Sequence, residues 1–163
     1  MRIASRTSVF VLAAAVIALL SLRLHAAPLD PLPLFFVVGI DGQPSVPSST
    51  FVRPGNWTLV IVRPDCLPCD RVLGVISEMS AEARLVVIVA GTDAAGGAAY
   101  AARYPGLASA RWYADPNYES SALPPYRAAP LMYGLRGNIQ RWSLAGIVPD
   151  LDTVRAALLN WVG

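Results

Sequence analysis

The cysteine pair Cys66 and Cys69 constrains this chain of 163 residues more than any other feature, because the sequence holds no other cysteine. Only Leu67-Pro68 lies between them, and a helix places residues three apart on one face. The run Trp57–Val62 before the pair is β-branched and aromatic, which predicts a buried strand. The segment Leu67–Ser80 has helical apolar spacing, with Pro68 in its first turn. Both cysteines are therefore expected where a helix begins directly after a buried strand.

That position gives each thiol a chemical expectation. The unpaired N–H groups and the dipole at a helix N-terminus favour negative charge, and the thiolate is the reactive form of cysteine. We expect Cys66 to attack a disulfide of a partner and Cys69 to resolve the mixed disulfide that forms. A purely stabilising disulfide is the alternative, although so short a loop removes little entropy from the unfolded chain.

Metal binding has less support from the residues present. Zinc requires four ligands, but there is no second cysteine pair, and the single histidine, His25, lies in the N-terminal segment. The same lone histidine disfavours a Ser–His or Cys–His hydrolase. Cuprous copper tolerates thiolates, so a copper-handling module with help from Met79 or Met132 stays open as an alternative. The sequence predicts no cofactor and no resident metal.

The N-terminal residues 1–27 have the pattern of an export segment. Arg2 and Arg6 precede the uncharged apolar run Ser8–Leu22, and small residues follow at Ala26-Ala27. A helix of this run would span about 22 Å, short of the roughly 30 Å hydrocarbon core. We expect a cleaved signal peptide or, as the alternative, a retained N-terminal membrane anchor. Either one predicts that a single domain, residues 28–163, is periplasmic or otherwise extracytoplasmic.

Charge says little about partners. The formal net charge is +2, and loss of Arg2, Arg6 and Arg23 with the export segment leaves ten arginines against 11 acidic residues. Nothing in this balance indicates a nucleic-acid partner. We expect Asp65, Asp70 and Arg71, beside the cysteines, to be solvent-exposed surface charges.

The apolar patterns predict an α/β fold. Alternation early in the chain and a hairpin late in it imply a mixed sheet with helices on both faces. A linker within the domain is expected over Val46–Gly55, and the four tryptophans are expected in the core or at its rim. Strands are expected at Phe35–Ile40, Trp57–Val62, Leu85–Ala90, Ala110–Tyr113, Leu131–Leu135 and Ile139–Leu144, and helices at Leu67–Ser80, from Asp93 to near Tyr104, Asn117–Ala122 and Leu151–Val162.

From Leu34 to the C-terminus the chain resembles the thioredoxin-like superfamily, most closely its exported TlpA-like and cytochrome-maturation branch. The matching parts are the strand leading into Cys66–Cys69, the segment Tyr126-Arg127-Ala128-Ala129-Pro130-Leu131 and the hairpin turn at Gly137-Asn138. The segment Asp41-Gly42-Gln43-Pro44 is similar to that branch's N-terminal extension. The resemblance implies a thioredoxin-like three-layer fold with a short N-terminal strand extension.

The resemblance also implies an activity, that of an extracytoplasmic thiol-disulfide oxidoreductase whose partners are protein clients with cysteines. Pro130 falls where the family has a cis-proline facing the cysteines, which would let the Ala129 backbone pair with an extended client. The Leu67-Pro68 dipeptide resembles that of reductive members, and a reductase in an oxidising compartment would need a membrane electron donor.

Two positions depart from the family pattern. Asp65 stands where an aromatic residue usually precedes the first cysteine, and Val60 stands where thioredoxin carries a buried acid that assists the resolving thiol. Asp65 would raise the pKa of the Cys66 thiol, whereas Arg63 or Arg71 would oppose it. These departures keep open a redox-inert, thioredoxin-fold interaction domain of an envelope assembly.

Overall fold

The computed structural model describes residues 30–79, 84–124, 128–146 and 150–162. The expected export segment lies outside these residues, as do Tyr126 and Arg127. Within this part, no helix is both long and apolar enough to span a bilayer. The elements in chain order are β1 (Phe36–Gly39), β2 (Val46–Pro47), η1 (Ser48–Phe51), β3 (Arg53–Val62), α2 (Leu67–Glu78), β4 (Leu85–Ala90), α3 (Ala94–Ala101), η2 (Pro105–Leu107), β5 (Arg111–Asp115), η3 (Glu119–Ala122), β6 (Leu131–Gly137), β7 (Ile139–Ala145) and α4 (Leu151–Val162).

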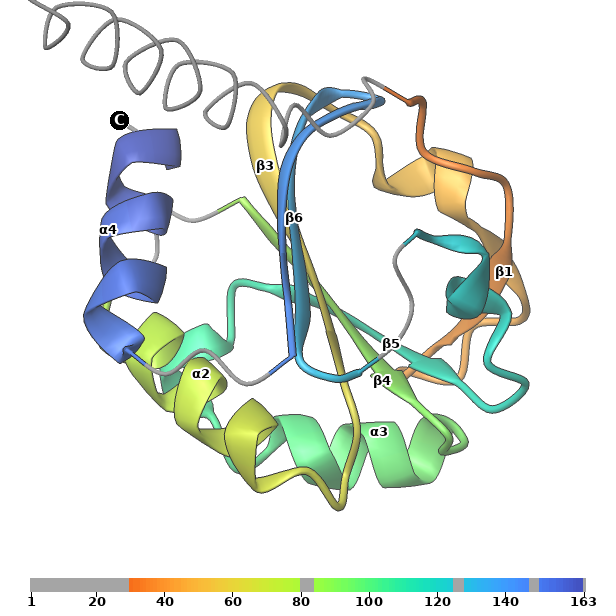
Figure 1. Cartoon of the computed structure of the whole chain (residues 1–163). Helices are drawn as coiled ribbons and strands as arrows, with labels where there is room; N and C mark the ends of the chain where they lie inside the picture. Colours follow the sequence, from red (N-terminus) through yellow and green to blue (C-terminus); the bar gives the residue numbers. More distant parts are fainter. Residues whose placement is uncertain (1–29, 80–83, 125–127, 147–149, 163) are drawn as a thin grey trace, which may run out of the picture.

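A seven-stranded mixed sheet, in the order β2-β1-β5-β4-β3-β6-β7, forms the centre of the molecule (Figure 1). Strands β3, β4 and β5 run parallel, whereas β1 and β6 join them antiparallel at opposite sides. All six residues of β4 are buried, as expected for a β-branched strand covered on both faces. Because β3 lies between β4 and β6, the loop after β3 is brought next to the start of β6.

Different helices cover the two faces of the sheet. Side chains of α2, of α4 and of the α3 region share one apolar cluster with one face, represented by Val72, Leu158 and Tyr100. On the other face, the 3-10 helix η1 contributes Phe51, and Leu123 follows η3 directly. The expected mixed sheet with helices on both faces is confirmed: among the described residues, α2, α3 and α4 cover one face, and the 3-10 helices η1 and η3 lie on the other.

The expected linker over Val46–Gly55 is wrong. This segment contains β2, η1 and the first residues of β3, and Phe51 within it has no exposed surface. The Phe51 ring lies 4.7 Å from the ring of Tyr113, centroid to centroid. The prolines and serines around Phe51 have the composition of a linker, so the sequence pattern did not indicate that this segment is ordered. Burial of Phe51 against β5 helps to hold it in place.

The predicted helix after Asp93 is also shorter than expected. Asp93 caps it, since its carboxylate accepts a hydrogen bond from the N–H of Gly96 at 2.8 Å, but α3 ends at Ala101. Gly97 lies so close to the sheet that an added Cβ would approach Ile40 to 3.0 Å and Ala114 to 3.2 Å. Its small size therefore serves packing, at a cost in helix propensity of about 1 kcal/mol.

Candidate active site

The cysteine pair lies at the N-terminus of α2, as predicted. Cys66 is the N-cap residue with extended backbone (φ −116°), and its Sγ accepts a hydrogen bond from the N–H of Cys69 at 3.2 Å. The two sulfurs are joined in a disulfide, with the Cα atoms 5.2 Å apart. Pro68 occupies the first turn, where a missing N–H leaves no hydrogen bond unmade. An electron pair on Cys66 Sγ thus faces the donor groups of a helix terminus.

The two sulfur-bearing residues differ in exposure. Cys69 is completely buried in the cluster beneath the α-helices, whereas Cys66 is partly exposed. Leu67, between them, leaves 63% of its surface open to solvent. A partner that approaches this end of α2 therefore meets Cys66 and an apolar side chain, and does not reach Cys69.

The segment before β6 lies against the cysteines. The Ala129-Pro130 peptide bond is cis, and the Ala129 carbonyl oxygen is 3.7 Å from Cys66 Sγ. Pairing of Leu131 in β6 with Ile61 near the end of β3 holds the two segments together. The structure thus brings Cys66, Cys69, Ala129 and Pro130 to one place, although 60 residues separate the two pairs in the sequence.

Charged neighbours of the cysteines fall into two groups. Asp65 and Arg63 form an ion pair of 3.5 Å with side chains 75% and 46% exposed, and Arg71 is exposed as well. The expectation of surface charges is confirmed for Asp65 and Arg71. Val60 is fully buried in the same apolar cluster as Cys69, so an aliphatic side chain stands where thioredoxin carries a buried acid.

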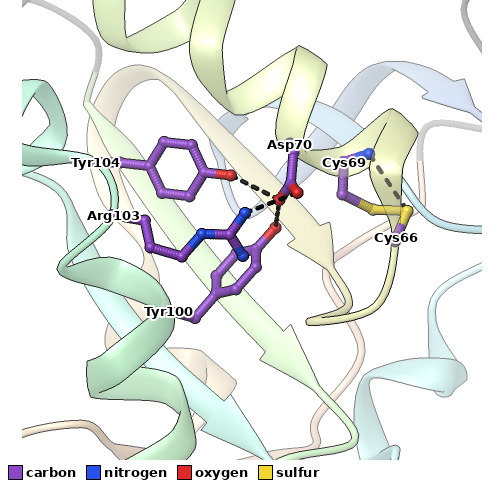
Figure 2. Close-up of polar contacts among 6 residues, drawn as sticks. All are labelled: Cys66, Cys69, Asp70, Tyr100, Arg103 and Tyr104. Carbon is purple, nitrogen blue, oxygen red and sulfur yellow. Dashed lines mark hydrogen bonds and ion pairs between the residues drawn. A yellow bond between two sulfur atoms is a disulfide. The ribbon is translucent and has the colours of Figure 1, made fainter.

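The same expectation is wrong for Asp70, which directly follows Cys69. Figure 2 shows its carboxylate turned toward the α3 region, where three donors surround it. The hydroxyls of Tyr100 and Tyr104 each donate to Oδ1 at 2.7 Å, and Arg103 donates to Oδ2 at 2.7 Å. The Arg103 guanidinium also lies 4.8 Å from the centroid of the Tyr100 ring. Asp70 is therefore a bound carboxylate that links α2 to the next helical segment.

This cluster changes the acidity of its members. Burial alone would raise the pKa of the Asp70 carboxyl, but hydrogen bonds from Tyr104, Tyr100 and Arg103 outweigh it and hold that pKa below its usual value. Burial, together with hydrogen bonding to Asp70, raises the pKa of both Tyr100 and Tyr104. At neutral pH the cluster therefore holds one carboxylate, one guanidinium and two neutral hydroxyl donors.

Of the two methionines considered as copper ligands, Met79 lies away from the cysteines, whereas Met132 belongs to the same buried cluster as Cys69. Met79 follows the last residue of α2, at the helix end opposite the cysteines, and Met132 is buried within β6. Among the described residues, no group of three or more histidine, cysteine, aspartate or glutamate side chains could hold a metal ion.

The predicted roles of the tryptophans in the core or at its rim are confirmed. Trp57 is completely buried, and its indole N–H donates to the Gly137 carbonyl at 2.6 Å. Trp112 is nearly buried, while the rings of Trp142 and Trp161 meet edge to face at 6.0 Å. All four contribute to packing.

Solved structures with the same arrangement include several thiol-disulfide proteins. One described as the thiol:disulfide interchange protein DsbE of Chlorobium tepidum matches with a TM-score of 0.64 at 19% identity, over 82% of this chain and 96% of that one. The thio-disulfide isomerase of Thermus thermophilus matches with a TM-score of 0.60 at 21% identity, over 84% of this chain and 97% of its own.

A secreted disulfide oxidoreductase of Mycobacterium tuberculosis, homologous to DsbE of E. coli, has a TM-score of 0.58 at 12% identity, over 77% of this chain and 95% of its own. No protein-family model and no curated protein sequence matches the chain. These structural matches span most of this chain and nearly all of each partner. The chain therefore has the thioredoxin-like fold.

Proposed function

We propose that the chain is a thiol-disulfide oxidoreductase that exchanges disulfides with protein clients outside the cytoplasm, and that it acts as a reductase. The observation that carries the proposal is the unequal pair at the start of α2, in which Cys66 is reachable and Cys69 is buried. A disulfide that served stability alone would not need one reachable sulfur at a helix N-terminus.

The reaction needs only the two thiols of the reduced form. The Cys66 thiolate attacks one sulfur of a client disulfide, forming a Cys66–client bond and releasing the other client sulfur as a thiolate. The Cys69 thiol then gives up its proton to the released client thiolate or to water and attacks Cys66 Sγ, which forms the Cys66–Cys69 disulfide and releases the second client sulfur as a thiolate. Two electrons pass to the client, so the client disulfide is reduced and the pair is oxidised.

Ala129 and Pro130 are the proposed client-binding residues. The Ala129 carbonyl lies 3.7 Å from Cys66 Sγ and can accept a hydrogen bond from a client backbone that runs past the sulfur in extended form. The exposed Leu67 side chain offers an apolar contact on the other side of Cys66. Together they would align a client sulfur with the attacking thiolate.

Direction and location rest on the sequence. Leu67-Pro68 between the cysteines supports a reductase, and the apolar N-terminal run supports export, with either a cleaved signal peptide or a retained anchor. The secreted disulfide oxidoreductase among the structural matches is consistent with that location. A reductase outside the cytoplasm must be re-reduced, and a membrane electron donor is the proposed source.

The test is capture of the mixed disulfide. The variant Cys69→Ser, reduced and mixed with a disulfide-containing client peptide, is expected to accumulate a Cys66–client adduct visible by mass spectrometry, because no resolving thiol remains. The matched variant Cys66→Ser should capture at least tenfold less, because Cys69 is buried. Equal capture by both variants, or none by either, would contradict the mechanism.

The reduction potential separates this proposal from its alternatives. A value near that of thioredoxin, about −270 mV, supports a reductase, whereas a value near −120 mV indicates an oxidant. In an interaction domain without redox function, the Cys66–Cys69 disulfide would stay oxidised even at potentials well below −270 mV. A copper-handling module would bind one cuprous ion per reduced chain and would not reduce insulin.

A further inference from the structure

Both oxygens of the Asp70 carboxylate are occupied by groups from the α3 region. Oδ1 accepts part-buried hydrogen bonds from Tyr100 and Tyr104, and Oδ2 pairs at 2.7 Å with Arg103, whose side chain is 48% exposed (Figure 2). The backbone N–H of Asp70 donates to the Cys66 carbonyl at 3.2 Å, which places Asp70 one helical turn from Cys66. The turn that carries the cysteines thus also carries a carboxylate, which points toward the α3 region and has a guanidinium directly against it.

We propose that Asp70 and Arg103 are positioning residues whose opposed charges set the reduction potential of the Cys66–Cys69 pair. This inference rests on the proposed disulfide exchange and adds to it a device for tuning. Neither residue touches the reacting sulfurs. Asp70 acts through its charge at the start of α2, and Arg103 acts by neutralising that charge.

The physical reason lies in the charge difference between the two redox states. The disulfide is uncharged, whereas the reduced pair carries a thiolate at the N-terminus of α2 once Cys66 ionises. A carboxylate in that turn repels the thiolate and opposes the helix dipole, so it destabilises only the reduced form. Arg103 offsets this repulsion. Loss of the Asp70 charge should therefore raise the potential, and loss of the Arg103 charge should lower it.

Other charges near Cys66 are less well placed to do this. Asp65 and Arg63 pair with each other in solvent, and Arg71 is exposed on α2. Water and salt screen such groups more than the half-buried Asp70, which is 27% exposed. From the side of β6, the described group facing Cys66 is the Ala129 carbonyl. The raised pKa of Tyr100 and of Tyr104 keeps both hydroxyls neutral at pH 9, so they add no charge.

The experiment compares Asp70→Asn, Arg103→Gln and the double variant in the full chain, by equilibration with dithiothreitol at pH 7 and pH 9. Asp70→Asn is expected to favour the reduced pair about threefold, which corresponds to about +15 mV, and Arg103→Gln to disfavour it by a similar factor. The double variant should lie between them. Shifts should be larger at pH 9, where more of Cys66 is thiolate, and alkylation of Cys66 by neutral iodoacetamide should change in the same order.

Two controls separate charge from loosening of the fold. Arg155→Gln removes an arginine of α4 that pairs at 2.9 Å with Glu78, the last residue of α2. Because this pair lies at the end of α2 opposite the cysteines, the variant should leave the reduction potential unchanged. Tyr104→Phe removes one hydrogen bond to Asp70 but no charge, and should also leave it unchanged. If the two substitutions acted by loosening α2, the reduction potentials of Asp70→Asn and Arg103→Gln would shift in the same direction.

The outcomes are distinguishable from failure of the proposed function. A wild-type pair that does not equilibrate with dithiothreitol, or that captures no client as Cys69→Ser, contradicts the oxidoreductase itself. The tuning role alone is overturned if disulfide exchange is normal but the equilibrium constant with dithiothreitol shifts in the same direction in Asp70→Asn and Arg103→Gln. It is also overturned if neither variant changes that constant by a factor of 1.5.

Discussion

Asp70 connects the protonation state of one residue to the stability of the fold. Three hydrogen bonds hold its pKa below the ordinary value, so the native protein binds the proton more weakly than the unfolded chain does. The resulting stability is fully present above the unfolded pKa of about 3.9 and is lost as pH falls through the lower folded pKa. Below the folded pKa, Asp70 is protonated in both states, so its ionisation no longer contributes to the free energy of unfolding.

Asp70→Asn should therefore lose about 1 kcal/mol of unfolding free energy at pH 7, a value reduced by partial exposure of the pair. The difference from the wild type should shrink toward zero between pH 4 and pH 2, as measured by urea unfolding of the oxidised protein. Asp65→Asn is the control, because its ion pair lies in solvent and should change stability by only a few tenths of a kcal/mol. A deficit that persists at pH 2 would contradict the assignment.

The role of Asp70 could not be predicted from its sequence neighbours. Next to Cys69 and Arg71 it has the local pattern of a surface charge, and its partners follow 30 to 34 residues later. Tyr100, Arg103 and Tyr104 reach it only because β4 and α3 bring them back to the same face of the sheet as α2. The cysteines, by contrast, were predictable because strand, proline and helix signals are adjacent in the chain.

At the scale of the element, Gly134 in the middle of β6 leaves room for the indole of Trp142 on the neighbouring strand β7. It pairs with Thr58 on β3 and with Trp142 on β7, and a Cβ at this position would overlap the indole of Trp142. The indole ring also packs against Trp161 of α4. The absence of a side chain at position 134 thus lets β7 and α4 approach each other.

Gly134→Ala is expected to destabilise the protein by about 1–3 kcal/mol, because Trp142 must leave its position. The matched change Gly74→Ala, in the interior of α2 where an added Cβ meets no atom within 4 Å, should instead stabilise by about 1 kcal/mol. Urea unfolding of both variants checks the two signs. A Gly134→Ala variant as stable as the wild type would show that Trp142 moves freely.

Two elements with one clear periodicity were predicted to the residue. The strand Leu85–Ala90 and the helix Leu151–Val162 are observed with the expected bounds, because an unbroken apolar run and a regular stripe each define both ends. The segment before Trp57 was missed, since β2 and η1 are short and the start of β3 contains proline and glycine. Pairing of β2 with β1 and burial of Phe51 against the sheet, both contacts with other parts of the fold, give this segment its structure.

At the scale of the molecule, the sheet order assembles the site. The end of β3 and the start of β6 are neighbours, and the cluster beneath α2 buries Cys69 while Cys66 remains open. The position of Pro130 beside the cysteines could be expected only from the family resemblance, because nothing in residues 128–131 alone points to a partner 60 residues earlier. The fold therefore gives the two chemically identical thiols different surroundings.

A reductase with this fold should be more stable oxidised than reduced. A low potential means that the disulfide is favoured in the native state, whereas in strong oxidants the reduced form is the stabilised one. Closing the four-residue loop from Cys66 to Cys69 removes less entropy from the unfolded chain than closing a longer loop would, but it still contributes about 2 kcal/mol. We expect the oxidised protein to melt about 5 °C or more above the reduced protein in calorimetry at pH 7.

The double variant Cys66→Ser/Cys69→Ser is the control: its melting temperature should be near that of the reduced protein and should not change when a reductant is added. A reduced protein that melts higher than the oxidised one would instead indicate an oxidant, since the folded state would then favour the open dithiol.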